Sequence, residues 1–205
     1  MPDFLFLADH PFLDFLNTRP VLHGRRVELL AGFEDLLGWL TRAGLLDPRR
    51  AREARRRWDR TPEGRRTGER ARAFRETLRE AVEGISRGRT LSARGVAAVN
   101  AVLGENAGSL RLERFGAGYR TRFAARSDRP VFLLGLVAET AADLIANADW
   151  GRIRRCGNPS CVLFLYDTTR NRARQWCSMA TCGNLMKVRA FRRRHRRKER
   201  RSPGT

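Results

Sequence analysis

The sequence lacks several features that mark common classes of protein. None of its apolar runs approaches the roughly 18 residues that a membrane-spanning helix requires. The N-terminus has neither the positive start nor the small-residue cleavage site of a signal peptide, so we expect a cytoplasmic protein without a membrane partner. Its three histidines, His10, His23 and His195, are not spaced as metal ligands, and we therefore expect no enzyme.

Lysine is scarce, although the chain is strongly basic. Only Lys187 and Lys198 are lysines among 42 basic residues, and such an arginine bias can come from GC-rich codon usage. The position of the charge is therefore more informative than its amount. Residues 151–205 contain 16 basic and two acidic residues, a net charge of +14 out of +20 for the whole chain. This concentration indicates a polyanionic partner, with nucleic acid favoured over an anionic membrane surface.

Cysteine is absent from residues 1–150. The four cysteines, Cys156, Cys161, Cys177 and Cys182, form two C-x4-C pairs separated by fifteen residues. A Cys-Gly-Asn triplet begins at Cys156 and recurs at Cys182. The spacing is not the C-x-x-C of thiol oxidoreductases, and scattered buried thiols would not repeat a spacing. Paired cysteines in a cytoplasmic chain more often hold a metal, and four thiolates suit tetrahedral zinc. We therefore predict one structural Zn²⁺ per chain.

Hydrophobic periodicity predicts a mostly helical N-terminal domain over residues 1–150. Alternating apolar and polar residues at 110–115 and 119–123, around a glycine turn, predict a β-hairpin. The expected fold class is mainly α with a small β-hairpin element, that is, α+β. Helices are expected around 10–20, 32–42, 48–60, 68–87, 92–104 and 130–147, with a short strand at 4–7.

Residues 151–198 are expected to form a second, smaller domain, followed by a basic tail at 199–205. The expected elements are a knuckle at 156–161, a strand at 162–166, a returning strand at 172–176 and a helix from 182 to about 200. A knuckle, a hairpin and a long basic helix that carries the last ligands are typical of a treble-clef zinc finger. The helix N-terminus favours thiolate charge through its dipole.

Two parts of the chain resemble known families. Residues 156–161 (CGNPSC), 176–184 (WCSMATCGN) and 187–194 (KVRAFRRR) resemble the CGNR zinc finger family, and residues 13–19 (LDFLNTR) resemble the start of the ABATE domain that precedes that finger. Together the two domains would cover nearly the whole chain. The resemblance implies a transcription regulator, without a known ligand or operator. Leu185 stands where the family pattern has arginine, so no role of that arginine is carried over.

The terminal helix is the main functional candidate. Residues 192–201 contain eight basic residues and one acidic residue, and their mutual repulsion would be relieved by phosphates. A helix fits the DNA major groove, where arginine contacts phosphates or guanine edges. Three arginines of the preceding polar turn could add phosphate contacts. The predicted nucleic-acid-binding residues are Arg170, Arg172, Arg174, Lys187, Arg189, Arg192, Arg193, Arg194, Arg196 and Arg197.

Two functions remain open at this point. The leading one is a regulator that binds double-stranded DNA and is associated with the nucleoid when bound. The alternative is a non-specific RNA-binding or ribosome-associated protein, and the basic run could also be only a solvated tail. Leu185, Val188 and Phe191 step by three residues and are expected to pack against the zinc module.

The end of the first helix could line a pocket for an unknown small-molecule effector, which would make the N-terminal domain a sensor. Hydrogen bonding at the helix end is the favoured alternative for its polar residues. A homodimer is also compatible with a regulator. The predicted pocket residues are Phe12, Phe15, Leu16, Asn17, Thr18 and Arg19.

Overall fold

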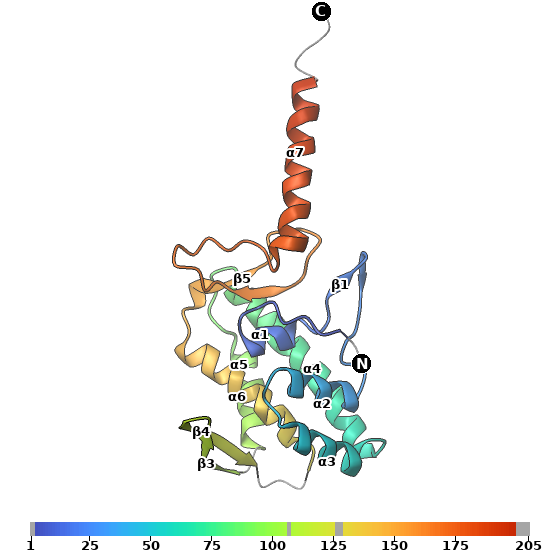
Figure 1. Ribbon diagram of the computed structural model, residues 1–205, viewed down its shortest axis with the longest axis vertical. Helices are drawn as coiled ribbons and strands as arrows, with labels where there is room; N and C mark the ends of the chain where they lie inside the picture. Colours follow the sequence, from blue (N-terminus) through green and yellow to red (C-terminus); the bar gives the residue numbers. More distant parts are fainter. Residues whose placement is uncertain (1–2, 106–107, 126–128, 200–205) are drawn as a thin grey trace, which may run out of the picture.

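A computed structural model describes residues 3–105, 108–125 and 129–199, with side chains described for 3–105, 112–121 and 129–195. Six helices form the body of the molecule (Figure 1). They are α1 (Pro11–Leu16), α2 (Phe33–Arg42), α3 (Pro48–Trp58), α4 (Pro62–Ile85), α5 (Ala93–Gly104) and α6 (Phe132–Asn147). Within the described residues, no helix is both long and apolar enough to cross a membrane.

Several helix starts follow from caps that the sequence contains. The Asp47 side chain accepts a hydrogen bond from the backbone of Arg49 at the start of α3, and Thr61 accepts one from Gly64 at the start of α4. A proline follows each cap, as the first turn of a helix permits. Thr61 lies between the helices expected at 48–60 and 68–87, and it caps α4, which begins six residues earlier than the predicted position 68.

Two antiparallel hairpins belong to the N-terminal part of the chain. The predicted one is confirmed as β3 (Gly108–Phe115) and β4 (Gly118–Ala125). It lies at the opposite end of the body from the C-terminal helix α7 (Asn184–Glu199) (Figure 1). A short hairpin of β1 (Val21–Leu22) and β2 (Arg25–Arg26) was not predicted.

The strand expected at residues 4–7 does not form. The backbone N–H groups of Leu7 and Ala8 both donate to Asp14 Oδ1 at 2.9 Å. The segment is therefore held by the first helix and not by a neighbouring strand.

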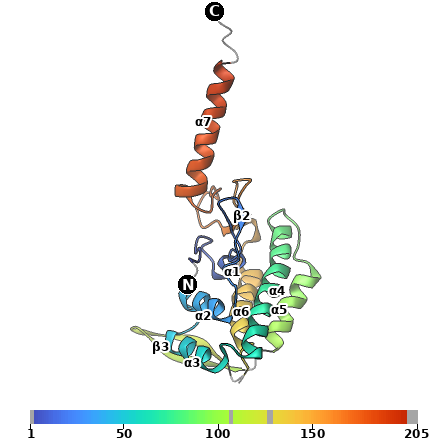
Figure 2. The same cartoon turned by 90° about the vertical axis from the view of Figure 1, so that its right-hand side faces the viewer.

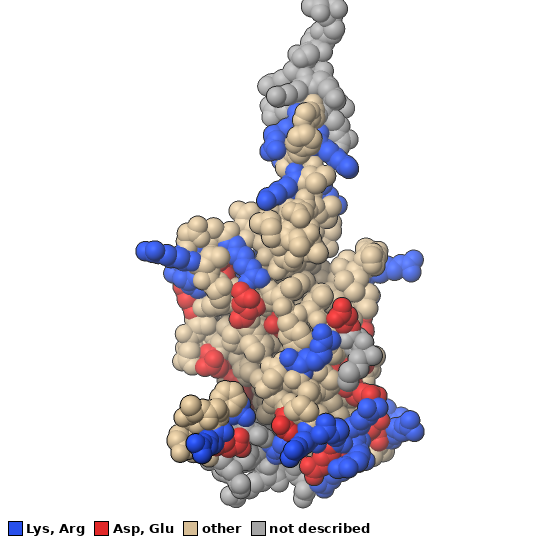
Figure 3. All heavy atoms as spheres, viewed as in Figure 1, with Lys and Arg blue, Asp and Glu red and all other residues tan. Residues whose placement is uncertain are grey.

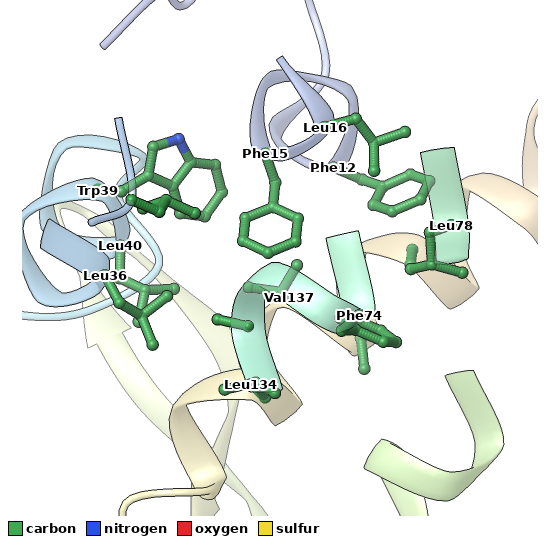
Figure 4. Packing of buried hydrophobic residues seen from close by; sticks show 14 of the residues in the cluster. Phe12, Phe15, Leu16, Leu36, Trp39, Leu40, Phe74, Leu78, Leu134 and Val137 are labelled. Carbon is green, nitrogen blue, oxygen red and sulfur yellow. The ribbon is translucent and has the colours of Figure 1, made fainter. Parts of the chain in front are cut away.

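The hydrophobic core lies where α1, α2, α4 and α6 meet (Figure 4). Phe15 of α1 packs edge-on against Trp39 of α2, with ring centroids 5.2 Å apart, and also faces Phe74 of α4. Leu134 and Val137 of α6 are fully covered on the other side. The helix expected at residues 130–147 therefore forms as α6, and most of its apolar side chains are buried in the core.

The cysteine-bearing module follows α6. Its elements are the 3₁₀ turn η1 (Trp150–Arg152), β5 (Ile153–Arg155), β6 (Phe164–Tyr166), the π-helical turn η2 (Met179–Gly183) and α7 (Asn184–Glu199). β5 pairs with β6 in antiparallel register, with Ile153 opposite Tyr166. The predicted fold class is confirmed: a mainly helical domain with a small hairpin precedes a zinc-finger-like module.

The predicted returning strand at 172–176 is wrong. The partner of β6 is β5, which precedes the first cysteine pair. Residues 167–174 instead form a loop around the buried Asp167 carboxylate, which accepts hydrogen bonds from the backbone of Thr169 and Arg174. Arg172 has φ 52°, a left-handed conformation that interrupts an extended strand.

α7 extends away from the body in both views (Figures 1 and 2). Among the described residues, its main packing partner is η2. Leu185, Val188 and Phe191 are exposed, so the prediction that they pack against the module is wrong. The reason is the direction of the helix, which leaves the module after its first turn and extends away from the other described elements.

Candidate metal centre and nucleic-acid interface

The four cysteines meet at one point of the module. Their Sγ atoms all lie within 4.8 Å of one another, and those of Cys161 and Cys177 are 3.9 Å apart. A tetrahedral zinc site with Zn–S bonds of about 2.3 Å places its sulfurs about 3.8 Å apart. Number, chemistry and spacing of the donors therefore fit one structural Zn²⁺.

The ligands come from two separate parts of the module. Cys156 and Cys161 lie in the connection between β5 and β6, whereas Cys177 precedes η2 and Cys182 lies within it. A metal bound by all four joins the hairpin to the start of α7. The predicted first knuckle and the helix start that carries the last ligand are thus present. The hairpin predicted from residues 162–166 and 172–176 is not.

Backbone and side-chain donors surround the sulfurs. Asn158 Nδ2 donates to Cys182 Sγ at 3.2 Å, and the Cys177 N–H donates to Cys156 Sγ at 3.4 Å. The Cys161 N–H donates to the Asn158 carbonyl at 2.8 Å, which closes the first turn. Asn158 therefore links the two cysteine pairs. Through its hydrogen bond to a sulfur, it can hold a metal ligand in position.

The glycines of the two Cys-Gly-Asn triplets allow close packing around one tryptophan. A Cβ atom on Gly157 would lie 3.0 Å from the ring of Trp176, and a Cβ on Gly183 would lie 3.1 Å from the same ring and closer still to Met179 Sδ. Neither glycine has a positive φ. The repeated triplet thus serves the small core of the module, in which Trp176 is partly buried.

The sulfurs are electrostatically coupled. Hydrogen bonds from Cys161 and Cys177 lower the pKa of Cys156 to about 2. The hydrogen bond between Cys161 and Cys156 raises the pKa of Cys161 to about 12. The same contacts raise the pKa of Cys177. The first thiolate forms readily, but its negative charge opposes the ionisation of the neighbouring cysteines. A divalent cation at the site would neutralise that charge.

Two of the residues predicted to line a ligand pocket, Asn17 and Thr18, lie at the end of α1, at the junction between this helix and the zinc module. Asn17 Nδ2 donates to the Phe164 carbonyl and Asn17 Oδ1 accepts from the Phe164 N–H, both at 2.8 Å. Thr18 Oγ1 donates to the Phe15 carbonyl and accepts from Arg75 Nη1. Both polar side chains are buried, and their hydrogen-bonding capacity is used within the protein.

The remaining predicted pocket residues do not form a ligand site either. Phe12, Phe15 and Leu16 are fully covered and pack into the core (Figure 4). Arg19 lies at the surface, 3.5 Å from a carboxylate oxygen of Glu76. The prediction of a ligand pocket at the end of α1 is therefore wrong. The end of this helix packs against β6, in the place where a ligand was expected.

Two arginines of α4 strengthen the same junction, and sequence reasoning missed both. Arg79 donates to the carbonyls of Leu16 and Val162, and its guanidinium lies 4.9 Å from the ring centroid of Phe164. Burial lowers the pKa of Arg79. Arg75 is almost fully buried and pairs with both carboxylate oxygens of Glu28 at 2.7 and 2.6 Å. In an arginine-rich helix, no local signal distinguishes these two from exposed neighbours.

The three turn arginines have different surroundings. Arg174 is only 19% exposed at its side chain, because it donates to Asp9, to the Leu7 carbonyl and to the Cys177 carbonyl. Its predicted phosphate contact is therefore wrong, since the guanidinium ties the N-terminal segment to the metal site. Arg172 pairs with Asp149 at 2.8 Å, and Arg170 is exposed.

The basic residues of α7 remain available to a partner. The side chains of Lys187, Arg189, Arg192, Arg193 and Arg194 are exposed, and Figure 3 shows basic atoms around the projecting helix, above the point where it leaves the body. Arg196 and Arg197 continue the helix, but their side chains lie outside the described part of the chain. The structure thus presents a cationic helix mounted on the four-cysteine site.

Comparison with known proteins agrees with this architecture. Residues 152–195 match the family model of the CGNR zinc finger. Residues 9–148 match the ABATE model, whose description is "Putative stress-induced transcription regulator". A search of curated proteins finds no match. The matched regions meet at the junction of the helical body and the metal site, and the chain belongs to the ABATE family, with a CGNR zinc finger after its N-terminal domain.

Proposed function

We propose that the protein is a transcription regulator that binds double-stranded DNA through α7. The single observation that carries this proposal is the projecting helix, whose five described basic side chains are all exposed. A helix of this diameter enters the major groove, and the arginines reach the phosphates that line it. The role is one of binding, and no catalytic step is proposed.

The metal site gives the helix a defined direction. Cys182 lies in η2, immediately before α7, and the other ligands connect it to β5 and β6. Lys187 and Arg189 lie in the first turns above this mount, where side chains are best held for contact with base edges. Arg192, Arg193 and Arg194 lie further out and are assigned to phosphates.

A salt titration tests the proposal. Fluorescence anisotropy with a labelled 20-base-pair duplex would compare the wild type with Arg193→Ala. If Arg193 neutralises a phosphate, the slope of log affinity against log salt becomes less steep by about 0.9 in the variant. Arg49→Ala is the matched control, since Arg49 is exposed on α3 and its loss changes the net charge equally. Equal slopes for all three proteins would contradict the assignment.

Competition with double-stranded RNA of the same length addresses the alternative function. A DNA regulator prefers the DNA duplex, because the deep and narrow major groove of A-form RNA does not admit a helix. Genome-wide immunoprecipitation should then give discrete upstream peaks in the nucleoid. Diffuse or ribosomal signal would instead support a non-specific RNA-binding protein.

An effector and a homodimer are part of the same proposal. A cavity of about 420 Å³ lies away from the junction, between the α2–α3 connection, α6 and β4, and it replaces the pocket predicted at α1. Its lining includes Arg50, Arg120, Asp47 and Glu139, and this mixture of charges would suit a small polar effector. Ligand screening by thermal shift, with Arg120→Ala as the variant, tests this part independently of DNA binding.

A further inference from the structure

The projecting helix carries apolar side chains that folding does not use. Leu185, Val188 and Phe191 are 43%, 47% and 55% exposed. The small core of the zinc module is built without them, from the cysteines, Val162, Leu163, Leu165 and Trp176 among others. Large apolar side chains grouped on an exposed element point to a contact with a partner.

These side chains form one stripe along α7. At about 100° per residue, Leu185, Val188 and Phe191 lie within about 120° of one another on the same face. The ring of Phe191 packs against that of His195, with centroids 4.2 Å apart, and continues the stripe by another turn. From Leu185 to His195 the stripe is about 15 Å long.

Basic side chains border the stripe on both sides. Measured from Val188 around the helix, Lys187 and Arg194 lie about 100–120° to one side. Arg189 and Arg193 lie about 100–140° to the other side. Arg192 lies one helical turn after Val188 along α7 and therefore falls within the edge of the apolar stripe. The face is therefore an apolar strip between two rows of cations.

This pattern selects among partners. A second copy of α7 would bring its own cations against these rows, and their repulsion opposes such a pairing. Lipid-bound helices present a continuous apolar face, whereas Arg192 interrupts this one. The DNA major groove is about 12 Å wide, has phosphates on both walls and exposes the 5-methyl groups of thymine on its floor.

We infer that Leu185, Val188 and Phe191 contact thymine methyl groups, so that α7 prefers thymine-containing sites over sites that lack these methyls. The inference rests on the proposed DNA binding and adds its base preference. Arg193 and Arg194, at the outer ends of the two rows, meet the two phosphate walls. Lys187 and Arg189 reach base edges beside the stripe, and the stripe itself meets the floor of the groove. Val188, at the centre of the stripe, is the residue on which the preference depends most.

The test compares two 20-base-pair duplexes of alternating sequence, one with dA and dT and one with dA and dU. Both carry the same phosphates and differ only in the thymine methyl groups. The wild type should bind the dT duplex about tenfold more tightly, as expected for burial of two or so methyl groups. Val188→Ala should lose most of that ratio while its salt slope stays that of the wild type.

Val96→Ala is the matched control. Val96 is 43% exposed on α5, so the same substitution removes a similar surface away from α7. This variant should retain the tenfold ratio. Zinc content and circular dichroism equal to those of the wild type would show that each variant is folded.

Four outcomes would overturn the inference. Equal binding of both duplexes with a steep salt dependence would leave DNA binding intact and remove the thymine preference. No binding to either duplex would remove the proposed function as well. Loss of a wild-type dimer in Val188→Ala, seen by sedimentation, would assign the stripe to a second copy. Binding to phosphatidylserine vesicles that Val188→Ala abolishes would assign it to a membrane surface.

Discussion

Two phenylalanines of the zinc module have opposite surroundings. Phe164 of β6 is fully buried, belongs to the main hydrophobic core, and has both backbone polar groups bonded to Asn17. Phe191 of α7 is 55% exposed. One half of the module is thus part of the helical body, whereas the other half extends away from it. A single zinc site joins the two halves.

Loss of zinc should separate the halves, and we expect this to be the largest effect. Structural zinc contributes an apparent binding free energy of about 10–16 kcal/mol in zinc-finger peptides. Cys182→Ser should therefore abolish stoichiometric zinc in elemental analysis and eliminate DNA binding. Hydrogen exchange should become fast over residues 177–195, while β5 and β6 stay protected by the core. Equally fast exchange in β6 and α7 would contradict the division.

The second prediction compares the phenylalanines directly. Phe164→Ala should lower the free energy of unfolding by about 3–5 kcal/mol, because it leaves a cavity in the core. It also removes the ring below Arg79. Phe191→Ala should change the free energy of unfolding by less than about 0.5 kcal/mol, as is usual at exposed sites. Urea denaturation of the zinc-loaded proteins measures both, and similar losses would show that α7 has a packing partner.

The hydrogen bonds of Asn17 come next in size. Asn17→Ala leaves the N–H and C=O of Phe164 without partners in the interior, at about 1–3 kcal/mol each. Asn147→Ala is the matched control, since Asn147 is exposed and its side chain donates to Asp143 in the same helix. Urea denaturation should show a loss of at least about 2 kcal/mol for the first variant and a much smaller one for the second. Equal losses would mean that the junction contributes little.

The pH dependence at Asp14 should give the smallest effect. Burial raises the pKa of Asp14 to about 6, against the opposing hydrogen bonds from Ala8 and Leu7. The folded protein thus holds this proton more tightly than the unfolded chain does, so its contribution to stability falls as the pH rises from about 4 to about 6. Asp14→Asn keeps an oxygen acceptor and should show a smaller decline over this range. Parallel pH profiles in urea denaturation would refute the assignment.

Much of the architecture could be predicted because its signals are local. Asp47 marks the start of α3 by its own hydrogen bonds, and the glycine turn between β3 and β4 marks a hairpin. The two cysteine pairs predict a zinc site for the same reason, since each C-x4-C turn prepares two ligands within six residues. The resemblance to the CGNR zinc finger family likewise rested on short segments, among them those that contain these cysteines.

The errors arose where distant parts of the chain meet. Asn17 and Phe164 are 147 residues apart, and nothing near Asn17 indicates that its amide bonds to a strand. Arg174 resembles any exposed turn arginine until its contacts with Asp9 and Leu7 are seen. Arg75 and Arg79 are similarly indistinguishable, by sequence, from the exposed arginines around them.

By itself, the amino-acid sequence determined the helices, the four metal ligands and the concentration of positive charge near the C-terminus. Only the tertiary structure decided that β6 belongs to the core of the helical body and that the Leu185, Val188 and Phe191 face of α7 stays uncovered. The physical reason is that caps, turns and ligand spacing act over a few residues. Burial depends on which surfaces meet after the whole chain has folded.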